Sequence, residues 1–193
     1  MSGLPCRWTR GSSRSTSPWR RARWPTSGGA SGRAWVESRE ANRESGAVTE
    51  TAEALLRHYR DSRQGLLTAI EGLSDAALSE PTLDGWSVKD HLLHIALWDE
   101  IRASEVDRIS AGYESAWPLE VNYDEWGYEH RRHLAPAQAK WELQRSRERL
   151  LDAIAAASPR GLDGSLYREA GLRSDHEDQH TAWIRRWREG RPR

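Results

Sequence analysis

Four long stretches of this chain repeat apolar residues with the 3.6-residue period of an amphipathic α-helix, and this pattern limits the fold more than any other feature. They cover about 51–73, 87–109, 136–154 and 174–187. The chain also holds 23 Ala and 19 Leu against 5 Val and 6 Ile, a balance that favours helix over sheet. We therefore predict an all-α protein, built as a four-helix bundle.

Capping signals mark the starts of these helices. Ser87 is followed three residues later by Asp90, which resembles a capping box with Asp in place of Glu. Ser174 and Glu177 have the same spacing at the last helix. The third helix begins near a proline, which suits a first turn. A short additional helix is expected within 123–133.

Charge is divided unevenly along the chain. Residues 1–47 hold 9 Arg and 3 Glu, a net charge of +6, whereas residues 48–193 hold 20 Lys+Arg and 26 Asp+Glu, a net charge of −6. Residues 1–36 lack acidic side chains and show no helical or strand period. We therefore predict that 1–47 is a disordered tail rich in Arg, Ser, Gly and Trp, and that 48–193 forms the bundle domain.

The tail admits three interpretations. Arg and Trp side chains suit an arm that binds nucleic acid or an anionic surface, and an Arg- and Ser-rich composition is also typical of targeting peptides. The abrupt change to helix-forming sequence at Thr49 favours a third interpretation, an upstream start assigned ahead of a true beginning near Val48. The negative bundle domain itself gives no electrostatic reason to expect nucleic-acid binding.

Composition and missing motifs exclude several classes of protein. The longest apolar run, 153–157, is far shorter than the roughly 20 residues that cross a bilayer, so no membrane association is expected. Cys6 is the only cysteine, which excludes an intramolecular disulfide and fits a cytoplasmic location. The chain lacks GxGxxG, GxxxxGK[ST] and GxSxG, so neither a nucleotide cradle nor a hydrolase serine is indicated.

Two of the seven histidines have the spacing of metal ligands. His176 and His180 lie four residues apart on the last predicted helix, so both rings share one face and can occupy two positions of a zinc-type ion. A solvated pair on an acidic surface is the alternative. The segment also matches the HExxH pattern of zinc proteases, in which Glu177 would be the general base. Only 13 residues follow His180, and Glu189 is the sole candidate third ligand among them, so helix capping is the more natural role for Glu177.

His94 supplies a better third ligand from the second predicted helix. It is flanked by apolar residues and is expected to point into the bundle. If the second and fourth helices are neighbours, three neutral imidazoles converge and leave a coordination position open, as in catalytic metal sites. We expect His91 to be solvated or to lie behind the ligands, and His130 and His133 to lie on the surface. A ferritin-like di-iron site needs two Glu-x-x-His units, and this chain has one.

Two segments resemble a known family. The first opens the second predicted helix with Gly-Trp-Ser-Val-Lys-Asp and places a histidine eight residues after its tryptophan; the second is a His-x3-His pair followed by Trp-Ile. Their residues are Gly85 to Asp90, His94, Trp98, His176, His180, Trp183, Ile184 and Trp187. Over about residues 50–188 the chain resembles the DinB/YfiT-like superfamily of four-helix bundles, and within it ClbS/DfsB-type proteins. The resemblance implies that His94, His176 and His180 bind a divalent metal.

The functions of the family are diverse. They include thiol-dependent S-transferases, maleylpyruvate isomerases, hydrolases and resistance proteins that disarm electrophilic natural products. We predict a metal-dependent hydrolase or thiol-S-transferase that acts on an electrophilic small molecule; the alternatives are a non-catalytic metal- or ligand-binding bundle and, less favoured, an HExxH metalloprotease. Three imidazoles accept Zn, Ni, Cu or Fe. Any thiol must be a low-molecular-weight cofactor, because residues 48–193 contain no cysteine.

Further residues are expected around the metal. Four aromatic side chains are candidates to line a substrate pocket, with core packing as the alternative for each: Trp98, Trp117, Tyr123 and Trp126. Asp90 lies one turn before His94 and is expected to orient its ring or, in the more natural role, to cap the helix. The resemblance also implies a homodimer as one arrangement of the bundle.

Overall fold

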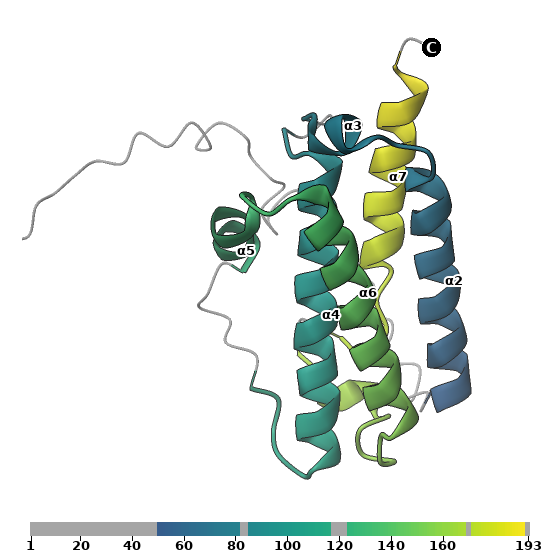
Figure 1. Cartoon of the computed structure of the whole chain (residues 1–193). Helices are drawn as coiled ribbons and strands as arrows, with labels where there is room; N and C mark the ends of the chain where they lie inside the picture. Colours follow the sequence, from purple (N-terminus) through teal and green to yellow (C-terminus); the bar gives the residue numbers. More distant parts are fainter. Residues whose placement is uncertain (1–49, 82–84, 117–122, 169–170, 192–193) are drawn as a thin grey trace, which may run out of the picture. The chain divides into compact units, whose positions relative to one another are not determined.

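The computed structural model describes residues 50–81, 85–116, 123–168 and 171–191, which all belong to the unit Asn42–Arg193. The predicted tail (1–47) and Trp117 lie outside these ranges. Within them the four predicted long helices are present (Figure 1): α2 (Ala52–Ile70), α4 (Val88–Ser110), α6 (Pro136–Ala155) and α7 (His176–Glu189). The shorter elements are α3 (Asp75–Ser79), α5 (Tyr123–Arg131) and the 3-10 turn η2 (Gly164–Leu166). In the described ranges the only strand-like feature is one isolated bridge, so the predicted all-α fold is confirmed.

Of the two predicted capping boxes, the one at the start of α4 is present and the one at the start of α7 is not. α4 begins with a complete capping box, in which the Ser87 side chain accepts from the Asp90 N–H and the Asp90 carboxylate accepts from the Ser87 N–H at 3.0 Å. The box predicted at Ser174 and Glu177 is wrong. Asp175 is the N-cap of α7 and makes no side-chain cap bond. Glu177 instead turns into the bundle interior, where it is 4% exposed.

The first predicted helix ends slightly earlier than expected, and a short helix that was not predicted follows it. α2 ends at Ile70, because Gly72 follows with a φ of +73°, a left-handed conformation that glycine adopts without strain. The short helix α3 then begins at Ser74, whose side chain accepts from the Ala77 N–H. The sequence pattern did not predict α3, because five residues carry too little periodicity.

The four long helices form the bundle. α2 and α7 run in one direction and α4 and α6 in the opposite direction (Figure 1). α4 packs most extensively on α6, and α2 packs on α7. The long connection between α4 and α6 carries α5, which lies against α4 because Gly127 has no Cβ; a Cβ there would come within 2.6 Å of Leu97 Cδ2. This close approach places α5 beside the middle of α4.

The interior has an apolar, polar, apolar order along the bundle axis. One apolar cluster includes Leu66, Leu92 and Leu143, and a second includes Leu55, Val106 and Leu150. Between these positions each long helix contributes buried polar residues: Arg63, Asp99, Arg147, and Glu177 with His180. These buried polar residues lie near the middle of α2, α4 and α6 and in the first two turns of α7. None of the described helices combines the length and the apolar character that crossing a membrane requires.

Candidate metal centre

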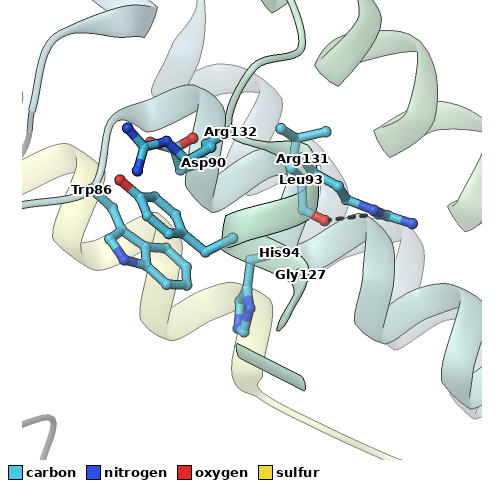
Figure 2. A pocket seen from close by; sticks show the side chains of 8 residues that line it. Trp86, Asp90, Leu93, His94, Gly127, Arg131 and Arg132 are labelled. Atoms are coloured by element: carbon cyan, nitrogen blue, oxygen red, sulfur yellow. Dashed lines mark hydrogen bonds between the residues drawn. The ribbon is translucent and has the colours of Figure 1, made fainter. Parts of the chain in front are cut away.

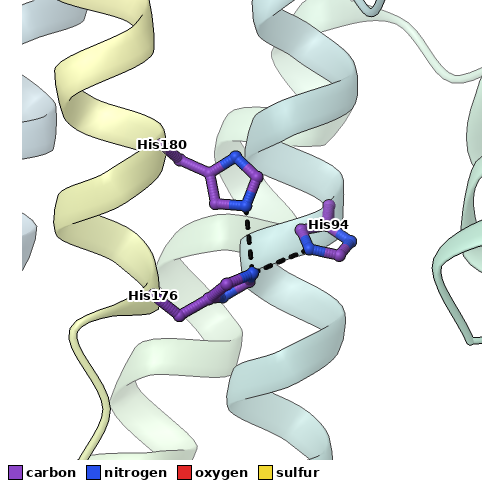
Figure 3. A group of neighbouring side chains, drawn as sticks. All are labelled: His94, His176 and His180. Carbon is purple, nitrogen blue, oxygen red and sulfur yellow. Dashed lines mark hydrogen bonds between the residues drawn. The ribbon is translucent and has the colours of Figure 1, made fainter. Parts of the chain in front are cut away.

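Three imidazoles from two helices converge in the polar middle of the bundle. His94 comes from α4, and His176 and His180 come from the first two turns of α7, four residues apart on one face (Figure 3). The Nε2 atom of His176 lies 2.9 Å from Nε2 of His94 and 3.0 Å from Nε2 of His180. These three residues, named here the histidine cluster, offer ligand atoms that all lie within 4.8 Å of one another. The structure thus brings the three predicted ligands together.

Burial keeps these imidazoles neutral. His94 is 8% exposed and His180 2%, and burial holds the pKa of each well below the ordinary 6.5, with neighbouring imidazoles acting in the same direction. Burial also lowers the pKa of His176 to about 3. His176 is only half-buried, so solvent reaches the cluster at this residue. A neutral imidazole has one free lone pair, which is the form that binds a metal.

Hydrogen bonds within the cluster cannot satisfy all three rings. The Nε2 atom of a neutral imidazole carries either one N–H or one lone pair. His176 Nε2 nevertheless faces two other Nε2 atoms at hydrogen-bond distance, so it can form one well-directed bond and leaves the other contact poorly paired. A cation facing three lone pairs removes this conflict.

The outward nitrogens of two rings face polar groups. Nδ1 of His180 lies 2.8 Å from Nδ1 of His91, and Nδ1 of His94 lies 3.7 Å from Oδ1 of Asp124 on α5. His91 is 0% exposed, so the solvated alternative for this residue is wrong and the position behind a ligand is the one observed. Metal-binding histidines commonly have such a partner at the second ring nitrogen.

The donor set fits a divalent transition metal. Two nitrogens at about 2.0–2.1 Å from a tetrahedral ion lie roughly 3.3 Å apart, close to the two distances of 2.9 and 3.0 Å measured here. Three neutral nitrogens are borderline-soft ligands that suit Zn, Ni, Cu or Fe. A bound ion would therefore face the Nε2 atom of each ring.

Glu177 lies beside this cluster in sequence but belongs to a different group of side chains. Its carboxylate accepts hydrogen bonds from Ser62 at 3.0 Å, Arg63 Nε at 2.6 Å and Arg147 Nη2 at 2.5 Å. Asp99 accepts from the same two arginines, at 2.9 Å each. Arg63, Asp99, Arg147 and Glu177, named here the ionic layer, thereby join all four long helices. The residue considered as a general base is thus held by two guanidinium groups.

Asp90 lies at the start of α4, and its Oδ2 accepts both the Ser87 N–H and the Ser87 hydroxyl. Its Oδ1 lies 3.6 Å from Lys89 Nζ. Asp90 and His94 line the same small cavity under α5, together with Trp86 and Arg132 (Figure 2). The hydrogen bonds of Asp90 are those of a helix cap. The carboxylate that the structure places beside Nδ1 of His94 is that of Asp124, which sequence reasoning missed because α5 is remote in sequence from His94.

Aromatic rings surround the histidine cluster. The ring of Trp98 is centred 5.6 Å from His176, Trp183 lies 4.9 Å from His180, and Trp86 lies 5.2 Å from His94. Trp98 also donates from Nε1 to Asp124 at 3.4 Å. Of the predicted pocket residues, Trp98 is thus at the cluster. Trp86 and Trp183 were part of the sequence motif but were not predicted to face the metal.

The two remaining candidates within the described ranges lie on α5. Tyr123 and Trp126 contact each other with ring centres 6.5 Å apart. Trp126 is 44% exposed and stacks on His130 at 4.7 Å, away from the contacts of the histidine cluster. His130 and His133 are exposed, as predicted.

The fold and the site together define a class: a helical bundle with a buried three-histidine centre built across two helices. The family model for the DinB superfamily matches residues 58–184, and the chain belongs to this superfamily. The matched range contains the residues of the predicted resemblance from Gly85 to Ile184, and Trp187 lies just beyond it. Proteins of this superfamily typically bind a divalent metal. No curated protein and no solved structure matches the chain significantly.

Proposed function

We propose that this protein is a metal-dependent enzyme of hydrolase or thiol-S-transferase type that acts on an electrophilic small molecule, in a detoxification or resistance role. The observation that carries the proposal is the convergence of three neutral imidazoles on one point, two of them buried and the third, His176, half-buried and open to solvent. Three protein ligands leave a coordination position for water or substrate, which is typical of catalytic centres.

The roles of the chain's own residues follow from their contacts. His94, His176 and His180 would hold the ion through Nε2. A divalent ion with three neutral ligands keeps its full charge, and it would supply Lewis acidity that activates a water or a thiol near neutral pH. Asp124 and His91 orient two of the three rings from behind.

The tryptophans favour an apolar substrate. Trp86, Trp98 and Trp183 each lie within about 6 Å of a ligand imidazole, by the centre-to-centre distances given above. Trp98 and Trp183 are half-buried and offer flat apolar surface to an organic substrate, whereas Trp86 is 5% exposed and packs against His94. Thiol transfer requires a thiol from outside the bundle, because residues 48–193 contain no cysteine.

The first experiment tests the metal centre. Wild-type protein, His94→Ala and the control His133→Ala are purified in parallel, and their metal content is measured by mass spectrometry. His133 is exposed, so its removal changes the histidine count without touching the cluster. We expect metal in the wild type and in His133→Ala and little in His94→Ala. Equal metal content in all three proteins would reject the centre.

The second experiment tests catalysis. Metal-loaded protein is incubated with a panel of electrophiles (epoxides, activated esters, Michael acceptors), each with and without a low-molecular-weight thiol such as glutathione. Multiple turnovers in water alone indicate a hydrolase, and turnovers that need the thiol indicate an S-transferase. Stoichiometric capture without turnover would instead support sequestration.

A structural metal is the second candidate function. The ion would join α4 to α7, two helices that pack less extensively on each other than α4 packs on α6. The protease alternative has less support, because the two arginines of the ionic layer hold the Glu177 carboxylate that would have to activate water.

A further inference from the structure

We infer that His91 is a positioning residue that fixes the tautomer of His180, so that the Nε2 lone pair of His180 faces the metal centre. This inference rests on the proposed metal binding and adds a residue to it. It assigns a role to a fourth buried histidine that is not among the three residues of the cluster.

The contact itself requires a definite arrangement of protons. Nδ1 of His91 and Nδ1 of His180 are 2.8 Å apart, and the two residues are 0% and 2% exposed. Two buried nitrogens at this distance share one proton, with one ring donating and the other accepting. If His180 donates, its Nε2 carries a lone pair. If His91 donates, the proton of neutral His180 sits on Nε2.

Only the first arrangement leaves the Nε2 lone pair of His180 available to a cation, and His91 would hold this arrangement before the cation binds. Nε2 of His180 points at Nε2 of His176, 3.0 Å away, on the side where the three rings meet. A proton there would block His180 as a ligand. The Nδ1–H of His180 must therefore be directed outward, and His91 is the acceptor that receives it. Partners of this kind set which nitrogen binds the metal.

His91 is better placed for this role than Asp124 is for His94. The Asp124 contact is 3.7 Å, beyond hydrogen-bond length, and the Asp124 side chain is 48% exposed. The His91 contact is a full hydrogen bond in a buried setting. His91 also approaches the outer nitrogen of His180, which distinguishes a supporting residue from a fourth ligand.

The test compares two substitutions at one position. His91→Leu keeps a side chain of similar volume but removes the Nδ1 atom that would accept the hydrogen bond from His180. His91→Asn keeps an acceptor, because an amide oxygen can lie near the place of Nδ1. Zn²⁺ and Co²⁺ affinities are measured by chelator competition, with circular dichroism confirming that each variant is folded and His133→Leu as the matched control. We expect His91→Leu to lower the affinity for both metals by about 10–100-fold. We expect His91→Asn to retain most of the wild-type affinity.

A second readout examines the tautomer directly. In metal-free protein labelled with ¹⁵N-histidine, long-range ¹H–¹⁵N spectra report which nitrogen of each ring is protonated. We expect the Nδ1–H tautomer for His180 in the wild type and in His91→Asn, and a shift toward Nε2–H in His91→Leu. A purely structural role for His91 would leave this tautomer unchanged.

The outcomes separate this inference from the proposed function. Metal binding in the wild type with unchanged affinity and tautomer in His91→Leu would overturn the role of His91 alone. Failure of the wild type to bind either ion would overturn both proposals. A Co²⁺ spectrum that shows four imidazoles in the wild type and three in His91→Leu would also overturn the inference, because His91 would then be a ligand.

Discussion

The ionic layer and the histidine cluster are two polar groups in the bundle interior that share two helices, α4 and α7, and they differ in how completely the protein satisfies their hydrogen bonds. In the ionic layer two carboxylates meet two guanidinium groups, and short hydrogen bonds link them. Arg63 also donates to the Leu143 carbonyl at 2.5 Å, and Arg147 donates to the Tyr59 carbonyl. Charge and hydrogen bonding are thus balanced within the protein.

The histidine cluster lacks this balance. Its three neutral rings compete for one another's Nε2 atoms, and the outer nitrogen of His180 is the one with a partner at hydrogen-bond distance, namely His91. A satisfied buried network holds helices in register, whereas an unsatisfied one marks a place where a ligand completes the structure. His176 and Glu177 are adjacent in the sequence, but Glu177 belongs to the satisfied ionic layer and His176 to the unsatisfied histidine cluster.

The largest expected effect comes from opening the ionic layer. Asp99→Ala leaves Arg63 and Arg147 buried without a shared carboxylate, and we expect a loss of about 3–5 kcal/mol in the free energy of unfolding. Urea denaturation in the presence of a chelator measures it. Asp107→Ala is the control on the same helix, because Asp107 is 58% exposed in its pair with Arg149 and should cost less than about 1 kcal/mol. Similar losses in both variants would contradict a structural role for the layer.

Adding metal should stabilise the protein through the histidine cluster. An ion present at 100 times its dissociation constant raises the free energy of unfolding by about 2.7 kcal/mol, provided that it binds only the folded state. The thermal midpoint with and without Zn²⁺ measures the gain. We expect no gain in His94→Ala and a full gain in Asp107→Ala. An equal gain in His94→Ala would place the binding site elsewhere.

Alkaline pH should lower the free energy of unfolding through Tyr59, which packs against Arg147 of the ionic layer. Tyr59 donates to the Leu172 carbonyl at 2.6 Å beneath the Arg147 guanidinium, and burial raises its pKa to about 12. The unfolded chain releases this proton from about pH 10, so the contribution of Tyr59 to stability falls by about 1.4 kcal/mol per pH unit between pH 10 and 12. Tyr59→Phe should flatten the stability profile by that amount. Parallel profiles for the two proteins would show that Tyr59 is not the source.

The smallest effect is expected from the histidine cluster without metal. His94→Leu removes a ring whose hydrogen bonds are poorly paired and keeps apolar volume, so the free energy of unfolding with chelator present should change by less than about 1 kcal/mol. Urea denaturation of wild type and variant measures the change. A loss as large as that of Asp99→Ala would mean that the cluster, like the ionic layer, is a structural network.

Periodicity and capping predicted most of the fold. The four long helices follow from their apolar repeats, and the capping box at Ser87 and Asp90 is observed as predicted. The predicted capping box at Ser174 and Glu177 is wrong, because a tertiary contact competes with the local capping bond. Glu177 has the position of a capping residue, but two buried arginines bind its carboxylate more strongly than free N–H groups at a helix end.

The sequence by itself determined which side chains could hold a metal, because spacing along a helix places His176 and His180 on one face, and the family motif adds His94. Only the tertiary structure decided that α4 and α7 bring these rings together, that His91 and Asp124 lie beside their outer nitrogens, and that Glu177 does not join them. The physical reason is that helical spacing is a local property of the backbone. Contacts between α4, α5 and α7 instead depend on packing across the bundle, including the close approach that Gly127 permits.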